Sequence, residues 1–354
     1  MNDPSDHPAR RQVLRGAFAA AGTAAGTAAL WSLAGPPASA AEPSGAEPSG
    51  VESSGAGPFA EGTSAVASSA GGGAAARRLG RYEVLALLDA HGPFPGTRQA
   101  VFPAASPADW ERARDLDPAA FGPGDTWELD FRCFAVRRPG GRVTLVDAGV
   151  GPVGSPASAW APVPGRLPRV LAAAGIGPAD VEAVVLTHLH EDHFGWSVLP
   201  DGVPVFPNAR YVVQRAEIAA LAPTRTAMTY VVEPLRRAGL LHEADGRTVL
   251  AGAGGRGSGG AVTLLPTPGH TPGHQSVLVE GGGRRLLVTG DVLVHAVQLA
   301  APEVGYAFEA DPATARRTRV RLLDDARRTG TVLATAHLNR PFVRPRVDGW
   351  TSPA

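Results

Sequence analysis

The sequence predicts an α+β domain in which helices cover the outside of mixed β-sheets. Runs of apolar and β-branched residues with the character of strands recur along the last three quarters of the chain. The early runs come in adjacent pairs, whereas the later ones are separated by helix-like runs. Hydrophobic residues make up 44% of the 354 residues, which is enough for a substantial core. This order of elements favours layers with the helices outermost.

Eight segments are predicted to be strands, and five to be helices. The strands are 127–136, 142–146, 181–186, 209–213, 261–265, 276–279, 285–288 and 331–334. The helices are 107–116, 167–174, 216–221, 230–238 and 312–328. The last helix should begin after Asp311, a favourable N-cap, with Pro312 in its first position.

Residues 1–41 have the pattern of an export signal. Arg10 and Arg11 precede a weakly apolar run at 16–33, and Ala38-Ser39-Ala40 before Ala41 matches a signal-peptidase site. The paired arginines resemble the twin-arginine signal, so we expect folded export to the periplasm, cell wall or exterior by that machinery. A short transmembrane anchor is the alternative, but the run is poor in Leu, Ile and Val.

The rest of the chain divides by composition. Residues 42–78 consist mainly of Ala, Gly, Ser, Pro and Glu and repeat Glu-Pro-Ser-Gly, which predicts a disordered linker. One folded domain is expected over 79–346, followed by a tail at 347–354.

Charge and cysteine content exclude several classes of function. The 33 basic residues are all Arg and are balanced by 33 acidic ones, so the chain has no basic excess for nucleic acid. Cys133 is the single cysteine, which excludes an intrachain disulfide and a cysteine-based zinc cluster. We expect Cys133 to be a buried core residue. Any metal must be bound by His, Asp or Glu.

Residues of types that can bind metals follow five of the strand-like runs. A strand that ends at one edge of a sheet can deliver a polar side chain to a common site. The residues are Asp147, His188, His270, Asp291 and His337.

The densest motif is His188-Leu189-His190-Glu191-Asp192-His193, directly after an apolar strand. His188 and His190 point the same way if the chain is extended, whereas Asp192 and His193 lie beyond a turn and can face a second ion. Nitrogen and oxygen donors of this kind suit Zn²⁺.

Together these motifs resemble the metallo-β-lactamase superfamily over residues 80–346. The resemblance implies a four-layer αββα sandwich with a two-zinc site at one edge. It assigns His188, His190 and His270 to one zinc and Asp192, His193 and His337 to the other. Asp291 bridges the two ions, and Asp147 supports the site by hydrogen bonding to a ligand.

The implied activity is that of an exported dinuclear zinc hydrolase. A hydroxide that bridges the two metals would attack an ester, a lactone or a phosphotriester, and Asp192 could move a proton. Asp192 and Asp291 are therefore the catalytic candidates. The sequence after Asp291 looks like the branch of organophosphate hydrolases and lactonases, although Val294 stands where bacillus-type lactonases carry a Tyr.

Three other functions stay open. An iron-dependent oxygenase of sulfur compounds and a β-lactamase belong to the same superfamily, and a binding protein could keep the fold. His190 stands where diiron members carry Glu, and Asp291 stands where β-lactamases usually carry Cys or Ser. The expected partner is a small-molecule substrate rather than nucleic acid.

Several nearby residues are given roles around the site. His274 is expected to be structural, and His295 lies either in the pocket or at the surface. Residues 216–242 are a candidate lid. The candidate apolar pocket walls are Phe194, Trp196, Tyr306 and Phe308.

Overall fold

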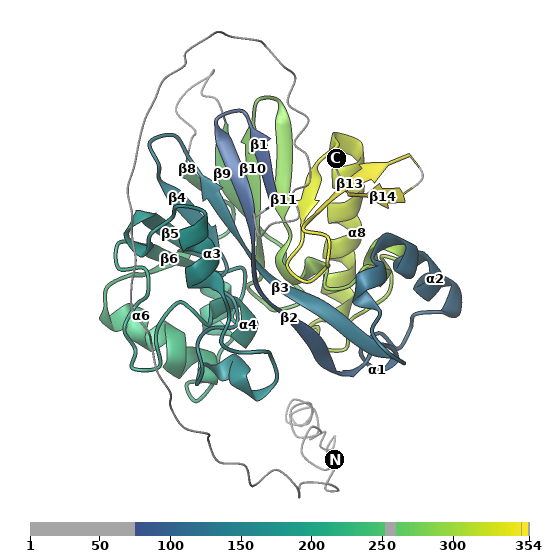
Figure 1. The fold of residues 1–354 in the computed structure, drawn as a ribbon, viewed down its shortest axis with the longest axis horizontal. Helices are drawn as coiled ribbons and strands as arrows, with labels where there is room; N and C mark the ends of the chain where they lie inside the picture. Colours follow the sequence, from purple (N-terminus) through teal and green to yellow (C-terminus); the bar gives the residue numbers. More distant parts are fainter. Residues whose placement is uncertain (1–74, 252–259, 348, 353–354) are drawn as a thin grey trace, which may run out of the picture. The chain divides into compact units, whose positions relative to one another are not determined.

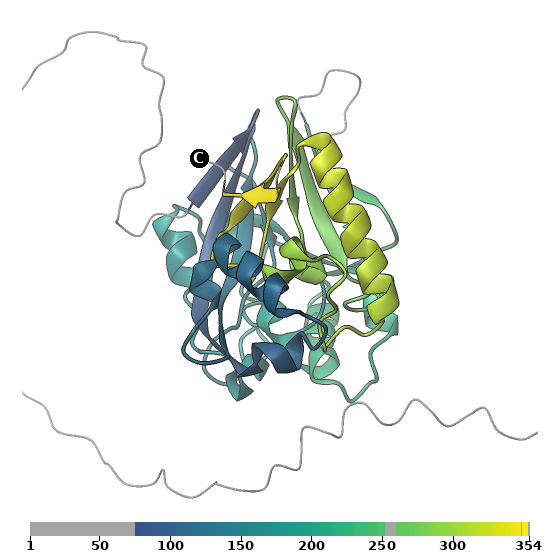
Figure 2. The same cartoon turned by 90° about the vertical axis from the view of Figure 1, so that its right-hand side faces the viewer.

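Two β-sheets pack face to face, and helices cover both outer faces. The computed structural model describes residues 75–251, 260–347 and 349–352. Within them each sheet has seven strands (Figure 1), and α8 lies along the outer side of the second sheet (Figure 2). This confirms the four-layer αββα sandwich.

The first sheet keeps the order of the chain. Its strands β1 to β4 are antiparallel neighbours, and β4 to β7 run parallel. The strands are β1 (Ala75–Leu79), β2 (Tyr82–Thr97), β3 (Thr126–Arg137), β4 (Val143–Val146), β5 (Val181–Val185), β6 (Arg210–Gln214) and β7 (Leu241–Ala244).

The second sheet also follows chain order, from β8 to β14. All neighbours are antiparallel except β11 and β12, which run parallel. The strands are β8 (Thr248–Ala251), β9 (Ala261–Pro266), β10 (Gln275–Gly281), β11 (Arg284–Val288), β12 (Val332–Ala334), β13 (Phe342–Arg346) and β14 (Gly349–Thr351).

The helices are short apart from α2 and α8. They are α1 (Arg98–Val101), α2 (Pro107–Leu116), α3 (Leu167–Ala173), α4 (Glu191–Phe194), α5 (Arg215–Ala219), α6 (Glu233–Arg237), α7 (Val297–Ala300) and α8 (Pro312–Thr329). Single turns are η1 (Pro118–Ala120), η2 (Pro156–Ala159), η3 (Pro178–Asp180), η4 (Met228–Val232) and η5 (Gly290–Val292). Asp311 caps α8 as predicted, accepting from the backbone N–H of Thr314 at 3.0 Å. Among the described residues no helix is long and apolar enough to cross a membrane.

The core has three apolar layers, because side chains alternate along each strand. On β3, Phe134 and Val136 face the layer between the two sheets, whereas Cys133 and Ala135 pack against the helices outside the first sheet. A third layer separates the second sheet from α2, α7 and α8. Cys133 is fully buried in this arrangement, which confirms the expected core role.

All eight predicted strands and all five helical segments form, with shifts of a few residues at their ends. The strand β2 was missed because Gly92, Pro93 and Gly96 are typical of loops. It forms because ladder pairs join it to β3, with register shifts after Leu88 and Pro93. Residues 1–74, which hold the predicted leader and most of the linker, lie outside the described residues.

Both predicted ends of the domain need correction. The expected linker reaches residue 78, but residues 75–79 form β1, whose five residues all pair with β2. The expected tail begins at 347, but β14 pairs with β13 and buries Trp350 against Arg327, whose guanidinium lies 5.0 Å from the ring centroid. Pairing with an existing strand stabilises short segments whose own sequence does not predict a strand.

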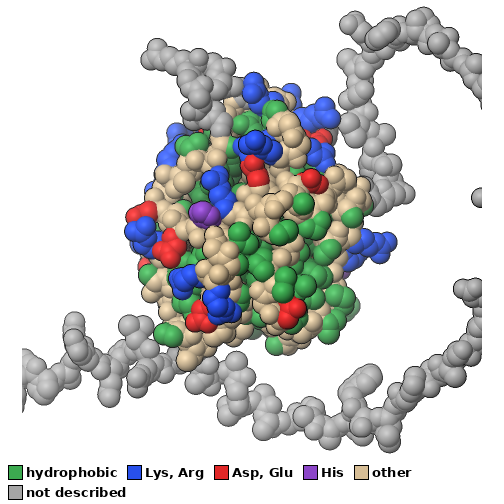
Figure 3. Space-filling model, turned by 90° about the vertical axis from the view of Figure 1, so that its left-hand side faces the viewer, with side chains coloured by type: hydrophobic (Ala, Val, Ile, Leu, Met, Phe, Trp, Pro, Cys, Tyr) green, Lys and Arg blue, Asp and Glu red, His purple; other side chains and the backbone are tan. Residues whose placement is uncertain are grey.

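Hydrophobic side chains gather on the face that carries α3 and α6 (Figure 3). A shallow apolar depression there is lined by residues of α3 and of the segments near it. These include Leu171, Ile176, Pro178, Val205 and Phe206.

Candidate metal centre

Strand ends from both sheets bring the predicted site residues together. Asp147 follows β4 and His188 follows the parallel strand β5, so both lie at one edge of the first sheet. Asp291 and His337 follow the parallel strands β11 and β12 of the second sheet. The segment after β9 adds His270. The seven predicted metal ligands form two clusters. Within each cluster, the donor atoms all lie within 4.8 Å of one another.

The first cluster consists of His188, His190, His270 and Asp291. The Nδ1 atom of His190 lies 3.0 Å from Nε2 of His188 and 2.9 Å from Nε2 of His270. Asp291 Oδ2 lies 3.3 Å from Nε2 of His270 and 3.8 Å from Nε2 of His188. His188 and His190 therefore face the same cluster, as predicted.

The second cluster consists of Asp192, His193 and His337. The Nε2 atoms of the two histidines lie 3.3 Å apart, and Asp192 Oδ2 lies 3.4 Å from His193 and 3.5 Å from His337. Asp192 and His193 reach this cluster because the chain turns into α4 immediately after His190. The turn thus separates the motif into two groups, as the sequence predicts.

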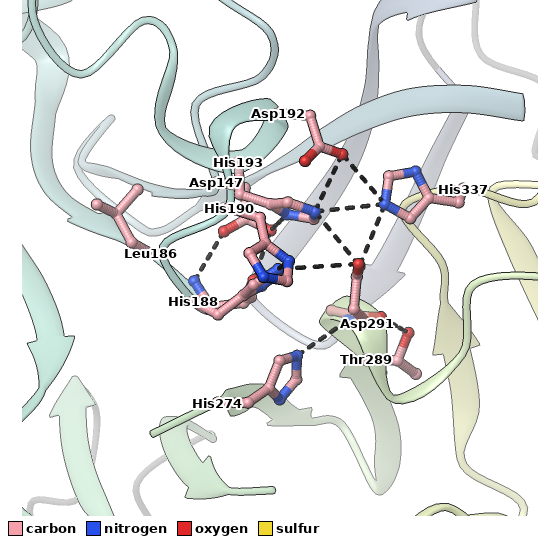
Figure 4. Close-up of polar contacts among 12 residues, drawn as sticks. Asp147, Leu186, His188, His190, Asp192, His193, His274, Thr289, Asp291 and His337 are labelled. Carbon is pink, nitrogen blue, oxygen red and sulfur yellow. Dashed lines mark hydrogen bonds and ion pairs between the residues drawn. The ribbon is translucent and has the colours of Figure 1, made fainter. Parts of the chain in front are cut away.

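Asp291 faces both clusters (Figure 4). Its Oδ2 is turned to the first cluster, whereas Oδ1 lies 3.3 Å from His193 Nε2 and 3.2 Å from His337 Nε2. Oδ1 is buried and accepts no hydrogen bond from the described residues. A buried carboxylate whose two oxygens face two separate groups of ring nitrogens is the arrangement that a bridging ligand between two cations requires.

The electrostatics of the clusters also suit cations. Burial, together with the neighbouring imidazoles, lowers the pKa of His188 and of His270 well below the usual value. These rings are therefore neutral and carry free lone pairs. In the second cluster the burial of His193 is outweighed by Asp192, Asp291 and Asp147, which raise its pKa well above the usual value. The carboxylates there attract positive charge.

Hydrogen bonds on the far side of the rings fix their orientation. Nδ1 of His193 lies 2.9 Å from Asp147 Oδ2, and Nδ1 of His337 lies 2.9 Å from the carbonyl oxygen of Asp130. A proton held on Nδ1 leaves the Nε2 lone pair for a metal. Sequence reasoning had not found Asp130, whose contribution comes through its backbone carbonyl.

Asp147 supports the site from a strained position. Its φ of 62° is the only positive value at a non-glycine residue in the described part of the chain. One carboxylate oxygen accepts from the backbone N–H of Thr187 at 2.8 Å, and the other accepts from the Thr187 hydroxyl and from His193. Asp147 thereby joins the segment after β4 to the start of the His188 motif.

His274 and His295 lie outside both clusters. The Nε2 of His274 accepts from the backbone N–H of Asp291 at 2.9 Å, and burial lowers the pKa of this imidazole to about 4. His274 is therefore a structural residue, as expected. His295 is buried in a ring of aromatic side chains that excludes the expected surface position, and burial together with Arg98 lowers its pKa to about 3. The surrounding rings are Phe102, Trp110, Phe121 and Trp127.

Of the four predicted pocket walls, Tyr306 lies beside the first cluster and Phe308 adjoins Tyr306. Tyr306 stacks on His270 with the ring centroids 6.1 Å apart, and Phe308 follows at 5.3 Å from Tyr306 with 55% of its surface exposed. Phe194 and the partly buried Trp196 instead pack with the core between the first sheet and its helices.

Three further rings, missed in the sequence, complete what we call the aromatic row. One end of the row, Tyr306, stacks on His270 of the first cluster. At the other end, the ring centroid of Phe131 lies 5.8 Å from that of His337 in the second cluster. The row consists of Phe94, Phe131, Trp160, Tyr306 and Phe308, with neighbouring centroids between 5.3 and 5.9 Å apart.

Comparison with known proteins decides the family. The family model described as "Metallo-beta-lactamase superfamily" matches residues 132–337, a range that holds every residue of both clusters. The chain belongs to the metallo-β-lactamase superfamily. Together with its N-acyl homoserine lactonase relatives, this membership makes the protein a metal-dependent hydrolase.

Named relatives in the superfamily include lactonases. The N-acyl homoserine lactonase AttM of Azorhizobium caulinodans is 33% identical over 235 residues, which cover 61% of this chain and 84% of the relative. The AttM protein of Rhizobium radiobacter is 31% identical over 234 residues, with the same coverage of 61% and 84%.

Solved structures share the fold. The hydrolase AbOPH, described as belonging to the β-lactamase superfamily, gives a TM-score of 0.66 at 24% identity and covers 80% of this chain and 98% of its own. AidC, described as a dizinc quorum-quenching lactonase, gives a TM-score of 0.61 at 20% identity and covers 79% and 96%.

Proposed function

We propose that this protein is an exported dinuclear zinc hydrolase that opens lactones or cleaves esters and phosphotriesters with an apolar substituent. The observation that carries the proposal is the position of Asp291, whose two oxygens face two separate groups of donors. His188, His190 and His270 would bind one ion, and Asp192, His193 and His337 the other. No thiol or hydroxyl nucleophile is part of this arrangement.

When bound, two zinc ions lower the pKa of a coordinated water and polarise the oxygen of the scissile group. The protein's own residues supply the remaining functions. Asp192 lies beside His193 and His337 and is a suitable group to pass the proton to the leaving oxygen. Asp147 and the carbonyl oxygen of Asp130 keep the rings of these histidines in one orientation.

Lactones rank first among the substrates. The AttM relatives bear the name N-acyl homoserine lactonase, and AidC is described as a lactonase. The outer members of the aromatic row, Phe94, Trp160 and the exposed Phe308, provide an apolar surface that suits an acyl or aryl group, and the buried Phe131 and Tyr306 connect them to the two clusters. β-Lactams rank last, because Asp291 occupies the bridging position where related lactamases carry another residue.

Export belongs to the same proposal. Residues 1–41 would be the twin-arginine signal peptide and 42–74 a linker that precedes β1. A protein that leaves the cell folded can bind its metal before export, which suits a site formed by strand ends from both sheets.

Elemental analysis and a substrate panel test this function. We expect close to two zinc ions per purified chain, and the highest kcat/KM on acylated lactones, aryl esters or phosphotriesters. One iron with negligible zinc would favour the sulfur-compound oxygenase instead. A kcat/KM for a penicillin or carbapenem tenfold above that for lactones and esters, about 1.4 kcal/mol of transition-state preference, would contradict the substrate class.

A further inference from the structure

One buried carboxylate joins the two segments that carry the histidines of the first cluster. Glu217 lies on α5 and is only 3% exposed. Its Oε1 accepts from the backbone N–H of Leu189 at 3.0 Å, and its Oε2 accepts from the backbone N–H of Gly273 at 2.9 Å. Leu189 stands between His188 and His190, and Gly273 lies three residues after His270.

The approach of the two segments to α5 is close. A Cβ atom at Gly273 would lie 2.1 Å from the backbone nitrogen of Glu217, so only glycine permits this packing. Gln275 adds a second connection between the segments, because its backbone N–H donates to the carbonyl oxygen of Thr187 at 2.9 Å. All of these contacts involve the two segments that carry the histidines of the first cluster.

The remaining donors have other supports. The backbone N–H of Asp291 donates to Nε2 of His274, whereas His193 and His337 are oriented by Asp147 and by the carbonyl oxygen of Asp130. Glu217 makes none of these contacts. Both of its oxygens already accept an N–H group, and its carboxylate belongs to neither cluster of donor atoms.

We propose that Glu217 is a positioning residue for the first metal-binding group alone. With its two hydrogen bonds it sets the separation of the His188–His190 segment from the His270 segment before any metal arrives. A site held in the binding geometry loses less conformational entropy on binding, which increases affinity. The inference rests on the proposed dinuclear zinc site and not on the substrate.

Two backgrounds separate the metal groups in a test. In H337A the second group is disabled, so chelator competition reports the zinc affinity of the first group. In H270A the first group is disabled, and the same titration reports the second. Glu217→Gln keeps the size of the side chain but replaces one acceptor by an NH₂ group, which leaves one backbone N–H without a partner.

We expect E217Q to weaken zinc binding about tenfold or more in the H337A background, as is typical for residues that orient metal ligands. In the H270A background the change should stay within about twofold. E217A removes both acceptors and should weaken the first group further. Should E217A not fold, circular dichroism shows this, and the test then rests on E217Q.

Asp89→Asn is the matched control. Asp89 is fully buried and accepts from the backbone N–H groups of Val150 and Leu167. Neither donor belongs to the segments that carry His188, His190 and His270. D89N should leave the affinity of the first group within about twofold of wild type. An equal loss in both backgrounds for E217Q, no loss in either, or a selective loss with D89N would overturn the positioning role. Failure of the wild type to bind zinc would instead overturn the proposed function.

Discussion

At the scale of single residues, the site depends on which ring nitrogen of each histidine is engaged within the protein and which one faces a cluster. His193 and His337 use Nδ1 for hydrogen bonds within the protein, which leaves Nε2 for the second cluster. His190 instead presents Nδ1 to the first cluster. Asp291 is the one described residue whose two oxygens face different groups, so its loss should have the widest effect.

Asp291→Ala should remove both ions together. The substitution takes one ligand from each group, so zinc affinity should fall by more than the roughly 10- to 100-fold loss typical of residues that only orient ligands. Zinc content after dialysis, measured by elemental analysis, checks this. His242→Ala is the control, because His242 is exposed on β7 and should leave the zinc content unchanged. Retention of a single tightly bound zinc in D291A would contradict the bridging role.

Phe308→Ala should weaken binding of long apolar substrates. The Phe308 ring is 55% exposed, so its loss costs the fold little, but it removes part of the apolar surface beside Tyr306. About 1 kcal/mol of lost contact corresponds to a roughly fivefold higher KM for a long-chain acyl lactone. The short-chain lactone should change much less.

Val249→Ala is the matched control for this variant, since Val249 is 48% exposed on β8. Steady-state kinetics on a series of acyl chain lengths distinguishes the two variants. Equal effects of F308A on short and long chains would argue against a role of the aromatic row in specificity.

At the scale of elements, short segments rather than long helices determine the site. The turn into α4 sends His190 to one cluster and His193 to the other. The segment between β9 and β10 brings His270 to the site and packs against α5 with glycine at the contact. At Gly273 a single added methyl group should therefore affect both packing and metal binding.

Gly273→Ala should destabilise the fold and weaken the first metal group. The new Cβ would lie 2.1 Å from a backbone nitrogen of α5, which cannot move as a flexible side chain would. Overpacking of this kind costs about 1–3 kcal/mol, which lowers the melting temperature by several degrees. Differential scanning calorimetry of the metal-free protein measures the stability, and chelator competition measures the affinity.

Gly305→Ala is the control for this substitution. Its Cβ would meet the nearest atom, Glu309 Oε2, at 3.5 Å, which is an ordinary contact. We expect a melting temperature close to that of the wild type. A similar loss in G305A and G273A would show that the close approach to α5 is not the cause.

At the scale of the whole molecule, the site requires both sheets. Asp147, His188 and His193 follow strands of the first sheet, whereas His270, Asp291 and His337 follow strands of the second. Neither half of the sandwich holds a complete cluster, because each cluster draws donors from both. Metal binding should therefore stabilise the packing of the two sheets, since a ligand that binds only the folded state favours it.

Export of the proposed precursor should depend on Arg10 and Arg11. The twin-arginine receptor reads the pair as an address, so replacing both with Lys should leave folded precursor in the cytoplasm. Cell fractionation followed by immunoblotting of the two forms measures this. Secretion unchanged by the double substitution would point to the general secretion route.

The sequence by itself determined the kind of fold and the donor set. The strand-like runs before Asp147, His188, Asp291 and His337 could be recognised because hydrophobic periodicity is a local property of the sequence. The polar residue that follows each run is equally visible there. The separation of the His188–His193 motif into two groups also followed from its spacing. The roles of these residues as zinc ligands and the export of the chain stay predictions.

Only the tertiary structure decided which residues support the donors. Glu217, Asp130 and the rings of Phe94, Phe131 and Trp160 are far in sequence from the histidines that they adjoin. No local pattern distinguishes a carboxylate that accepts two loop N–H groups from one at the surface. Likewise β1, β2 and β14 form because they pair with neighbouring strands. The free energy of this pairing depends on the partner strand, so the residues of these segments alone do not predict it.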